Sequence, residues 1–476
     1  MRSFADSNGD GVGDLPGLEA RLDYLEDLGV EVLWLMPIYP SPSVHGYDVM
    51  DLTAVHPQYG SLANLQSLVA AIHAKGMRIL LDFVPSHLSD EHPFFRDALE
   101  NPASPYSDWF VWTNDAHTTY AGFAGSRDMP RLNHYNPEVV DFLLDAARFW
   151  LDLDGDGDFG DGIDGFRVDN ATFPPTEFFV ALRRAVKQAN PEALLLGEAW
   201  LPDPADLARY FPGQFDALFD FSAYQVLAGD PSFHGDGLLA GRAHPALLTQ
   251  LFEEETRLFP RGAQPVRFLN NHDTDRTASE VGADPLRERL GAAWLAALPG
   301  PVMLYYGEEI GMAGTKGGPP DYDSYRRAPM DWYAAEQGVG QATWFVPADR
   351  SNHADDGISV EEQSGDPRSL LAFYRAVLRV RREQPAFQGT EWTIVRLETS
   401  GAGPWGFVRR GNDQAVTAVF NFASEARTVI VAAGDLPGLS LVDLLSNRRF
   451  EALAGEGLTL ELPPASVFYL AASHAN

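Results

Sequence analysis

Short apolar runs alternate with helical patterns over residues 1–385 of the sequence. Near-continuous apolar stretches at 31–38 and 78–84 are typical of strands that are buried on both faces. Further runs of this kind follow at 165–169, 194–199, 217–221, 266–270 and 302–306. Between them, apolar residues recur at helical spacing. The alternation predicts a parallel sheet covered by helices. Seven such strands predict a (β/α)8 barrel, an α/β fold, whose first strand is missing from the sequence, so the runs at 31–38 and 78–84 are its second and third strands.

Two segments break this alternation. Residues 87–136 are polar and aromatic with little periodicity, which predicts an excursion between the third strand and its helix. After a helix predicted at 369–382, short alternating runs separated by turn signals predict an antiparallel β-domain. The predicted division is a catalytic barrel in two parts (1–86 and 137–388), an excursion domain (87–136) and a C-terminal β-sandwich (389–476).

The composition disfavours several classes of partner and chemistry. A formal net charge of −32 argues against DNA or an anionic membrane, because phosphate groups attract Lys and Arg. No apolar run reaches the roughly 18 residues of a transmembrane helix, so we expect no membrane span. The absence of cysteine excludes disulfides and thiol chemistry. We expect a monomer that binds no nucleic acid, and a neutral ligand such as a sugar is compatible with the acidic surface.

Polar side chains gather where the predicted strands end. In a (β/α)8 barrel the catalytic groups lie at the C-terminal ends of the strands, where the loops converge. Buried carboxylates are costly unless they are paired or used in chemistry, so packing alone explains such a set poorly. The candidates are Asp82 and His87 after the third strand, Arg167 and Asp169 at the fourth, Glu198 at the fifth, and His272 and Asp273 at the seventh.

Four short segments carry these residues in a fixed order. They are Asp82-Phe-Val-Pro-Ser-His87, Gly165-Phe-Arg-Val-Asp169, Gly197-Glu198-Ala-Trp and Asn271-His-Asp273. Together they resemble the four sequence regions of the alpha-amylase superfamily, glycoside hydrolase family 13. Supporting matches are His45-Gly-Tyr-Asp48, Met129-Pro-Arg-Leu-Asn133 and Tyr306-Gly-Glu-Glu-Ile-Gly311. The first two resemble bacterial alpha-amylases intermediate between oligo-1,6-glucosidases and neopullulanases.

The resemblance implies a retaining mechanism that uses two carboxyl groups. Asp169 would attack the anomeric carbon and form a covalent glycosyl-enzyme, while Glu198 would protonate the leaving oxygen and then deprotonate water. Such pairs lie about 5–5.5 Å apart. Glu198 must be protonated at rest, so we expect burial and nearby negative charge to raise its pKa.

The remaining roles are also implied by the resemblance. Arg167 precedes Asp169 by two residues, so both side chains face the same way and the cation can hold Asp169 ionised. Asp273 would grip sugar hydroxyls and favour the distorted, oxocarbenium-like ring. The other predicted substrate-binding residues are Tyr47 as a stacking platform, Asp48 as a hydroxyl acceptor, His87 and His272 as hydroxyl donors, and Arg327 at the pocket edge.

A separate run near the N-terminus has the spacing of a calcium loop. Oxygen-bearing side chains stand on alternate residues with glycines between them, which suits a hard cation such as Ca2+. The resemblance implies a structural Ca2+ here and no organic cofactor, because the mechanism needs none. The predicted ligands are Asp6, Asn8, Asp10, Asp14 and the carbonyl of Val12. A second run, 152–161, has similar spacing and is either a second calcium loop or a solvated acidic turn.

Three positions depart from the family pattern. Ser86 stands where the family usually has an Asn that ligates calcium beside the excursion, which argues against that site. Asn170 follows the nucleophile where Ala or Val is common, at a position that influences linkage preference. The chain starts at Met1-Arg-Ser-Phe where relatives have a strand ending in Val-Arg-Ser-Phe, so we predict that the natural protein extends upstream.

Several activities fit the same carboxylates. The leading hypothesis is hydrolysis of alpha-1,4-glucosidic bonds in starch-like glucans and maltooligosaccharides. The rivals are an alpha-glucosidase or oligo-1,6-glucosidase, and a glucanotransferase or trehalose-forming isomerase in which a sugar replaces water. A silent sugar-binding protein on the same barrel is disfavoured because all three catalytic carboxylates are present.

Overall fold

The computed structural model describes residues 1–229 and 237–473, which form two compact units. The first unit comprises Met1–Glu26, Val30–Phe219 and Phe259–Gln264, and the second comprises Asp27–Gly29, Asp220–Leu258 and Pro265–Asn476.

The first unit contains five parallel strands, each hydrogen-bonded to the next along the chain. They are β1 (Val32–Leu35), β2 (Arg78–Phe83), β3 (Gly165–Val168), β4 (Leu194–Gly197) and β5 (Ala217–Phe219). Their near-continuous burial is the pattern of a sheet that is covered on both faces. Because all five run in one direction, the residues that follow them emerge at one edge of the sheet.

Glycine is required where the third of these strands begins. Gly165 has a φ of +137°, and a Cβ placed there would lie 2.1 Å from the carbonyl oxygen of Leu194 on β4. Any other residue would push β3 away from β4. The close approach lies where Gly165 pairs with Leu194, and on the other side of β3 the register with β2 places Arg167 beside Asp82.

Helices of the first unit begin at polar caps that the sequence supplies. Ser61 and Asn64 form a reciprocal capping box at the start of α3, and Asn136 caps α5. No helix within residues 1–229 or 237–473 is long and apolar enough to cross a membrane. The helices up to residue 219 are α1 (Leu15–Glu19), α2 (Leu22–Leu28), α3 (Leu62–Ala74), α4 (Pro93–Ala98), α5 (Pro137–Leu151), α6 (Thr176–Ala189) and α7 (Pro204–Leu207).

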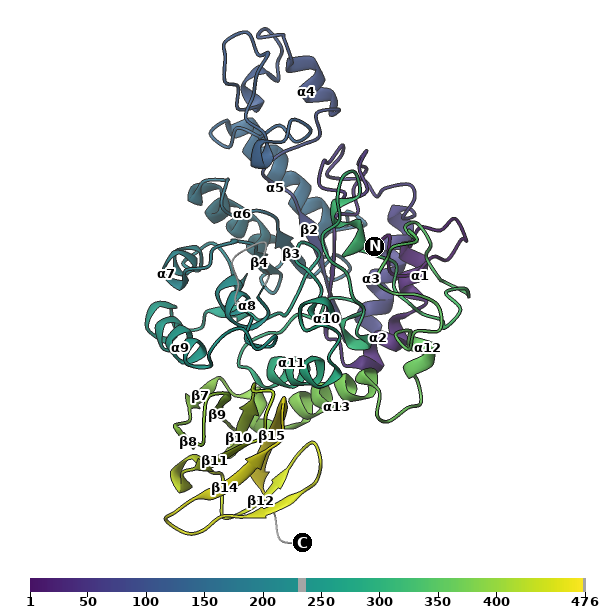
Figure 1. The fold of residues 1–476 in the computed structure, drawn as a ribbon. Helices are drawn as coiled ribbons and strands as arrows, with labels where there is room; N and C mark the ends of the chain where they lie inside the picture. Colours follow the sequence, from purple (N-terminus) through teal and green to yellow (C-terminus); the bar gives the residue numbers. More distant parts are fainter. Residues whose placement is uncertain (230–236, 474–476) are drawn as a thin grey trace. The chain divides into compact units, whose positions relative to one another are not determined.

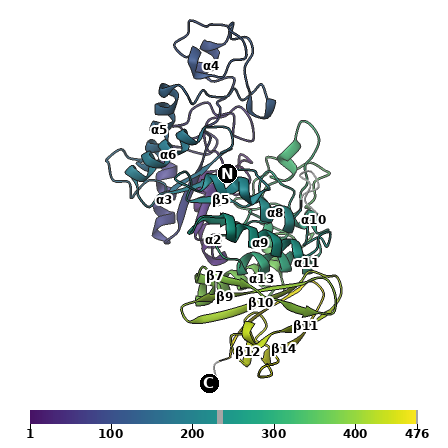
Figure 2. The same ribbon diagram turned by 90° about the vertical axis from the view of Figure 1, so that its left-hand side faces the viewer.

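Residues 87–136 contain α4 and loops joined by isolated antiparallel bridges, including Phe110 with Leu132 and Trp112 with Tyr120. Aromatic rings hold this segment together: Phe95 packs against both Phe110 and Trp112. In both views α4 and its loops lie beyond one end of α5 (Figures 1 and 2). Ring packing, not a regular ladder, therefore explains the weak periodicity of this segment.

The second unit continues the barrel pattern with shorter strands. β6 (Gln264–Val266) is followed by a parallel bridge between Arg267 and Val302, where the sequence predicts a strand at 302–306. The predicted strand is thus limited to one bridge. The helices from residue 220 onward are α8 (Phe221–Leu227), α9 (Ala246–Leu258), α10 (Thr277–Glu280), α11 (Pro285–Ala297), α12 (Val360–Gln363), α13 (Leu370–Glu383) and α14 (Pro385–Gln388).

The C-terminal strands form two antiparallel sheets, drawn in green to yellow in Figure 1. One has the order β13-β12-β15-β10-β9-β7 and the other β14-β11-β8, and apolar residues such as Val419, Val429 and Leu470 fill the core between them. The strands are β7 (Glu391–Ile394), β8 (Leu397–Thr399), β9 (Pro404–Gly411), β10 (Gln414–Asn421), β11 (Arg427–Val431), β12 (Ser440–Asp443), β13 (Arg449–Glu451), β14 (Leu458–Leu462) and β15 (Ser466–Ala472).

These sheets are joined to α11 by buried polar contacts. The hydroxyl of Tyr469 on β15 donates to the carbonyl of Ala293, and the guanidinium of Arg409 on β9 donates to the carbonyl of Ala297 at 2.8 Å. Figure 2 shows α11 and α13 beside β9 and β10. The last turn of α11 is therefore bonded from two sides, because Arg409 holds the Ala297 carbonyl and Arg381 on α13 holds those of Ala296 and Leu298.

A buried ion-pair group lies between α9 and the strand at 264–267. Arg267 donates to both carboxylate oxygens of Glu255, at 3.0 and 2.7 Å, and also contacts the carboxylate of Asp220. All three side chains are less than 5% exposed, and the guanidinium stacks over Phe252. The group is almost completely removed from water, so each member depends on the others.

We predict that Glu255→Leu lowers the free energy of unfolding by about 3–5 kcal/mol, because it removes one carboxylate from a buried cation. Chemical denaturation followed by tryptophan fluorescence measures the change. The matched control is Glu254→Gln, whose side chain is 44% exposed and should alter stability by less than about 0.5 kcal/mol. Equal stability of the Glu255→Leu variant and the wild type would contradict this view of the group.

Candidate active site

One guanidinium stands at the centre of the site in the first unit. Arg167 Nη1 lies 2.8 Å from Asp82 Oδ1 and 2.9 Å from Asp169 Oδ1, while Nη2 lies 2.5 Å from Glu198 Oε1. The Arg167 side chain is fully buried. A single cation thus holds a carboxylate from each of three neighbouring strands.

The fold brings these groups together through strand order alone. Asp82 is near the end of β2, Arg167 and Asp169 are at the end of β3, and Glu198 directly follows β4. The register pairs Asp82 with Arg167, and the Glu198 N–H donates to the Val168 carbonyl at 3.0 Å. Parallel strands therefore place the predicted nucleophile and acid/base on one edge, on either side of the same guanidinium.

Asp82 is the member of this cluster that was a candidate from the sequence but had no predicted role. Its Oδ2 accepts a hydrogen bond from the Tyr47 hydroxyl at 2.9 Å. Burial raises the pKa of Asp82 to about 6, although the neighbouring Arg167 acts to lower it. Asp82 is the first residue of the first sequence motif, and this position is the feature of the sequence that could have indicated its place in the site.

Asn170 has a second, unpredicted place in the site. Its φ is +44°, in the left-handed region that Asn tolerates better than most residues. This conformation points its backbone N–H at Glu198 Oε2, at 3.1 Å, and the Thr172 hydroxyl donates to its side-chain oxygen at 2.7 Å. Glu198 is therefore held on one oxygen by Arg167 and on the other by a main-chain amide.

The side chains that precede β2 are also anchored. Tyr47 is 9% exposed, and its hydroxyl is engaged by Asp82. Asp48 Oδ1 accepts from the hydroxyls of Ser41 and Ser43, the latter at 2.5 Å. The predicted substrate contacts of Tyr47 and Asp48 would use the ring face of the tyrosine and the second oxygen of the aspartate.

Both ring nitrogens of His87 have partners within the protein. Nε2 lies 3.1 Å from the Tyr47 carbonyl, so it carries the proton, and Nδ1 accepts from the Ser86 hydroxyl at 2.7 Å. Burial lowers the pKa of His87 to about 3, so the ring is neutral. The Tyr47 carbonyl thus sets the tautomer of His87, and Ser86, which departs from the family pattern, bonds the other ring nitrogen.

The second unit assembles the remaining predicted residues. Arg327 donates through Nη2 to Asp273 Oδ1 at 2.7 Å and through Nε to the His272 carbonyl at 2.9 Å. The His272 ring lies 2.9 Å from Asp273 Oδ2. The Asp273 side chain keeps 28% exposure, so its carboxylate is oriented by two neighbours and still reachable from solvent.

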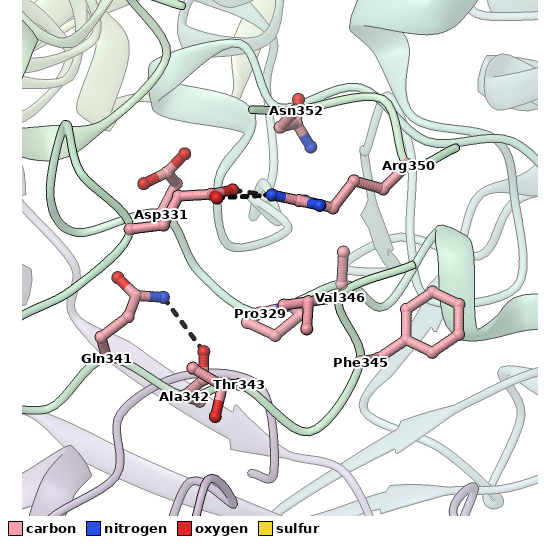
Figure 3. Close-up of a pocket in the computed structure, with 11 residues that line it drawn as sticks. Pro329, Asp331, Gln341, Ala342, Thr343, Phe345, Val346, Arg350 and Asn352 are labelled. Carbon is pink, nitrogen blue, oxygen red and sulfur yellow. Dashed lines mark hydrogen bonds and ion pairs between the residues drawn. The ribbon is translucent and has the colours of Figure 1, made fainter. Parts of the chain in front are cut away.

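A small cavity lies in the segment that follows Arg327 (Figure 3). It measures about 30 Å3, enough for about two water molecules but too small for a sugar ring. Its lining includes Asp331, Gln341 and an Arg350 that is paired with Glu336. Burial raises the pKa of Asp331 to about 7. The cavity contains none of the predicted catalytic residues.

The two predicted metal loops share one hydrogen-bond pattern. In the first, Asp6 accepts through Oδ1 from Gly9 N and through Oδ2 from Gly11 N, both at 2.7 Å. In the second, Asp152 accepts in the same way from Gly155 N at 2.8 Å and Gly157 N at 3.1 Å. The sixth residue of each loop is a glycine with positive φ, as in calcium loops.

The loops differ in how closely their acidic oxygens gather. Carboxylate oxygens of Asp152, Asp154 and Asp161 lie within 4.8 Å of one another, a spacing that ligands of one Ca2+ can have. In the first loop, Ser7 and Asn8 side chains donate to Asp14 Oδ2, at 2.8 and 3.2 Å. Both loops offer the oxygen donors that a hard cation prefers.

Comparison with known proteins agrees with the sequence motifs. The catalytic domain of the alpha-amylase family matches residues 1–389. Alpha-amylase 3 of Dictyoglomus thermophilum is 31% identical over 442 residues, covering 88% of this chain and 83% of that protein. Neopullulanase 2 of Thermoactinomyces vulgaris is 32% identical, with 95% and 69% covered. A trehalose synthase/amylase of Mycolicibacterium smegmatis is 32% identical, with 81% and 75% covered.

Solved structures agree with the predicted fold class. An alpha-amylase from H. orenii aligns with a TM-score of 0.85 at 29% identity, covering 99% of this chain and 98% of that one. The predicted (β/α)8 class with C-terminal antiparallel sheets is therefore confirmed. The chain belongs to the alpha-amylase family, glycoside hydrolase family 13, and is a hydrolase that acts on glycosidic bonds.

Proposed function

We propose that the protein is a retaining hydrolase of alpha-1,4-glucosidic bonds in starch-like glucans and maltooligosaccharides. The observation that carries the proposal is the guanidinium of Arg167 shared between Asp169 and Glu198. A cation placed between two carboxylates can set the short separation that a retaining pair needs. The matches to alpha-amylases support the choice of substrate.

In this proposal the side chains of the first unit divide the chemistry. Asp169, kept ionised by Arg167, attacks the anomeric carbon, and Glu198 delivers its proton to the leaving oxygen. Once the leaving sugar departs, Glu198 takes a proton from water, and that water releases the sugar from Asp169. The Asn170 amide holds Oε2 of Glu198 and Arg167 holds Oε1, so the acid/base carboxyl is oriented through both of its oxygens.

In the second unit, Asp273 accepts hydrogen bonds from hydroxyls of the distorted ring, where its contacts grow stronger as positive charge develops at the anomeric carbon. Arg327 holds the carboxylate that performs this task. His272 would donate to the same ring.

Glycosyl transfer to a sugar is the second candidate, because trehalose synthases are among the relatives. The two activities share the glycosyl-enzyme and differ in what attacks it. Product analysis separates them. Release of short maltooligosaccharides from maltoheptaose supports hydrolysis, trehalose formed from maltose supports transfer, and glucose from isomaltose supports a 1,6-glucosidase.

We predict that Asp169→Asn lowers kcat on maltoheptaose by roughly 10³-fold or more, because the amide cannot form the glycosyl-enzyme. Glu198→Gln should lose a similar factor on maltoheptaose but less on 4-nitrophenyl maltosides, whose leaving group needs no proton. The control is Glu192→Gln, an exposed glutamate of the same unit that should leave kcat unchanged. Full activity of Asp169→Asn would exclude the proposed mechanism.

A second prediction concerns the central cation. Arg167→Met should reduce kcat/KM by at least about 10²-fold and move the acidic limb of the pH profile upward by about 1–3 pH units, since the cation that favours ionised Asp169 is gone. Arg167→Lys keeps a positive charge at this position, so its kcat/KM and its pH profile should lie between those of the wild type and Arg167→Met. The control is Arg183→Gln, which removes a partly exposed pair with Asp216. An unshifted pH profile in both Arg167 variants would argue against this role.

We also propose that the loop at 6–14 binds a structural Ca2+ through Asp6, Asn8, Asp10, Asp14 and the carbonyl of Val12. The ion would tie the start of the chain to α1, which Asp14 caps. The glycine turns and oxygen donors support this assignment, and the similar pattern at 152–161 makes that loop the natural comparison.

Calcium at 100 times its dissociation constant should stabilise the protein by about 3 kcal/mol, and a chelator should reverse the effect. Thermal unfolding with added Ca2+ or EDTA measures it. Asp10→Asn should weaken the response, because this exposed residue can keep its bond to Val12 N while losing charge. Asp156→Asn is the matched change in the second loop. A response lost only in Asp156→Asn would assign the ion to 152–161 instead.

A further inference from the structure

The motif at 306–311 contains two consecutive glutamates that the proposed mechanism does not use. They form the start of a short 3-10 helix, η5 (Glu308–Ile310), in the second unit. Glu308 is 5% exposed and Glu309 is 2% exposed. Carboxyl groups this deeply buried are rare unless they are paired or have a function.

Glu308 is bound on both oxygens by residues from other elements. Tyr374 on α13 donates its hydroxyl proton to Oε1 at 2.7 Å, and the Asn270 side-chain amide donates to Oε2. Asn270 also donates to the Thr277 hydroxyl at 2.8 Å, while its own Oδ1 is buried and has no hydrogen-bond partner among the described residues. Glu308 therefore supplies one of the two contacts that fix the Asn270 side chain.

Asn270 directly precedes the segment that carries Asp273. Within that segment the Asn271 side chain accepts from Asp273 N at 2.8 Å, and Thr274 Oγ accepts from Asn271 N at 2.9 Å. Asn270 and Asn271 are 1% and 2% exposed. The segment is thus a tight turn, and the direction of Asp273 depends on the anchor at its first residue.

The same motif also holds the far side of this turn. Arg276 donates to the Tyr306 carbonyl at 2.7 Å and stacks over the rings of Tyr305 and Tyr306. Contacts from residues 305–308 therefore reach both ends of the 270–276 turn, at Asn270 and at Arg276.

We propose that Glu308 is a positioning residue for Asp273, acting in its neutral form through the side chain of Asn270. The inference rests on the proposed function, in which Asp273 binds the reacting sugar. Glu308 itself touches no substrate.

The surroundings of Glu308 explain why the neutral form is favoured. Burial is the main cause that raises its pKa to about 8, and Glu309 on the same turn adds to the effect, while Tyr374, Asn270 and Arg276 oppose it. The carboxyl accepts from the Asn270 amide through Oε2 and from the Tyr374 hydroxyl through Oε1.

A second glutamate, Glu288 on α11, lines a small cavity beside Glu308. Glu288 lines a cavity of about 10 Å3 together with Asn270, Glu308 and Tyr374, a space for about one water molecule. Burial raises the pKa of Glu288 to about 7, with Asp284 adding to the effect. Burial is the largest cause of the raised pKa of both glutamates, so the surroundings of this cavity favour the protonated form of each.

The sign of the pH effect follows from these pKa values. Because the pKa of Glu308 is higher in the folded protein than its ordinary 4.5, its contribution to stability is complete below pH 4.5. That contribution is lost as the pH rises through about 8. Glutamine, which cannot ionise, resembles the neutral form and removes this loss.

The test compares Glu308→Leu, Glu308→Gln and Glu288→Gln in the full chain with maltoheptaose. Glu308→Leu removes the anchor of Asn270 and should lower kcat by about 10- to 100-fold with KM changed less than about threefold, because misplacement of a transition-state contact acts mainly on kcat. Glu308→Gln should restore kcat to within about threefold of wild type and extend activity and thermal stability to higher pH. Glu288→Gln, which lines the cavity without bonding Asn270, should leave kcat unchanged.

Two results would overturn the inference. One is a Glu308→Leu variant with wild-type kcat; the other is a Glu288→Gln variant that loses as much kcat as Glu308→Leu. If Glu308→Leu does not fold, Asn270→Ser removes the same contact from its other end, and wild-type kcat in that variant would equally exclude the proposed role. A wild-type protein that cleaves no α-glucan would instead contradict the proposed function. In that case the pH dependence of unfolding, compared between wild type and Glu308→Gln, would still report on the buried carboxyl.

Discussion

The site depends on one cation that is shared by three buried carboxylates. Without the guanidinium of Arg167, Asp82, Asp169 and Glu198 would bring like charges together away from water, a state that proteins avoid by binding protons. Arginine suits this task because its planar fork offers several donors in fixed directions. The cation therefore explains both why the carboxylates can be buried and why they can stand close together, as the proposed mechanism requires.

Much of this arrangement is readable from the sequence, because parallel strands have a simple geometry. The apolar runs at 78–84, 165–169 and 194–199 gave the strands, and residues that end neighbouring parallel strands must meet at one edge. The C-terminal sheets were equally clear, since alternation and turn residues are local signals. Family motifs then singled out the carboxylates to which we assign chemical roles in the proposed mechanism.

The parts that sequence reasoning missed depend on contacts between distant residues. Asn170 was interpreted as a neighbour of the nucleophile that influences linkage preference. Its left-handed backbone conformation directs its main-chain amide at Glu198, and no local sequence pattern predicts that positive φ. Asp82 was a candidate without a role, because its pairing with Arg167 comes from strand register. The strand predicted at 302–306 is observed as a single bridge, because an apolar run does not specify how far two short strands stay paired.

The contacts between the C-terminal sheets and α11 bear on how this protein can be shortened or recombined. Tyr469 and Arg409 donate to the main-chain carbonyls of Ala293 and Ala297 in that helix, and both come from strands near the C-terminus of the chain. Cutting the polypeptide after α13 would strip those carbonyls of their donors and uncover the apolar side of the helix. The sheets are accordingly better regarded as part of the scaffold than as an exchangeable appendage, and grafting a foreign one would require a tyrosine and an arginine at matching positions.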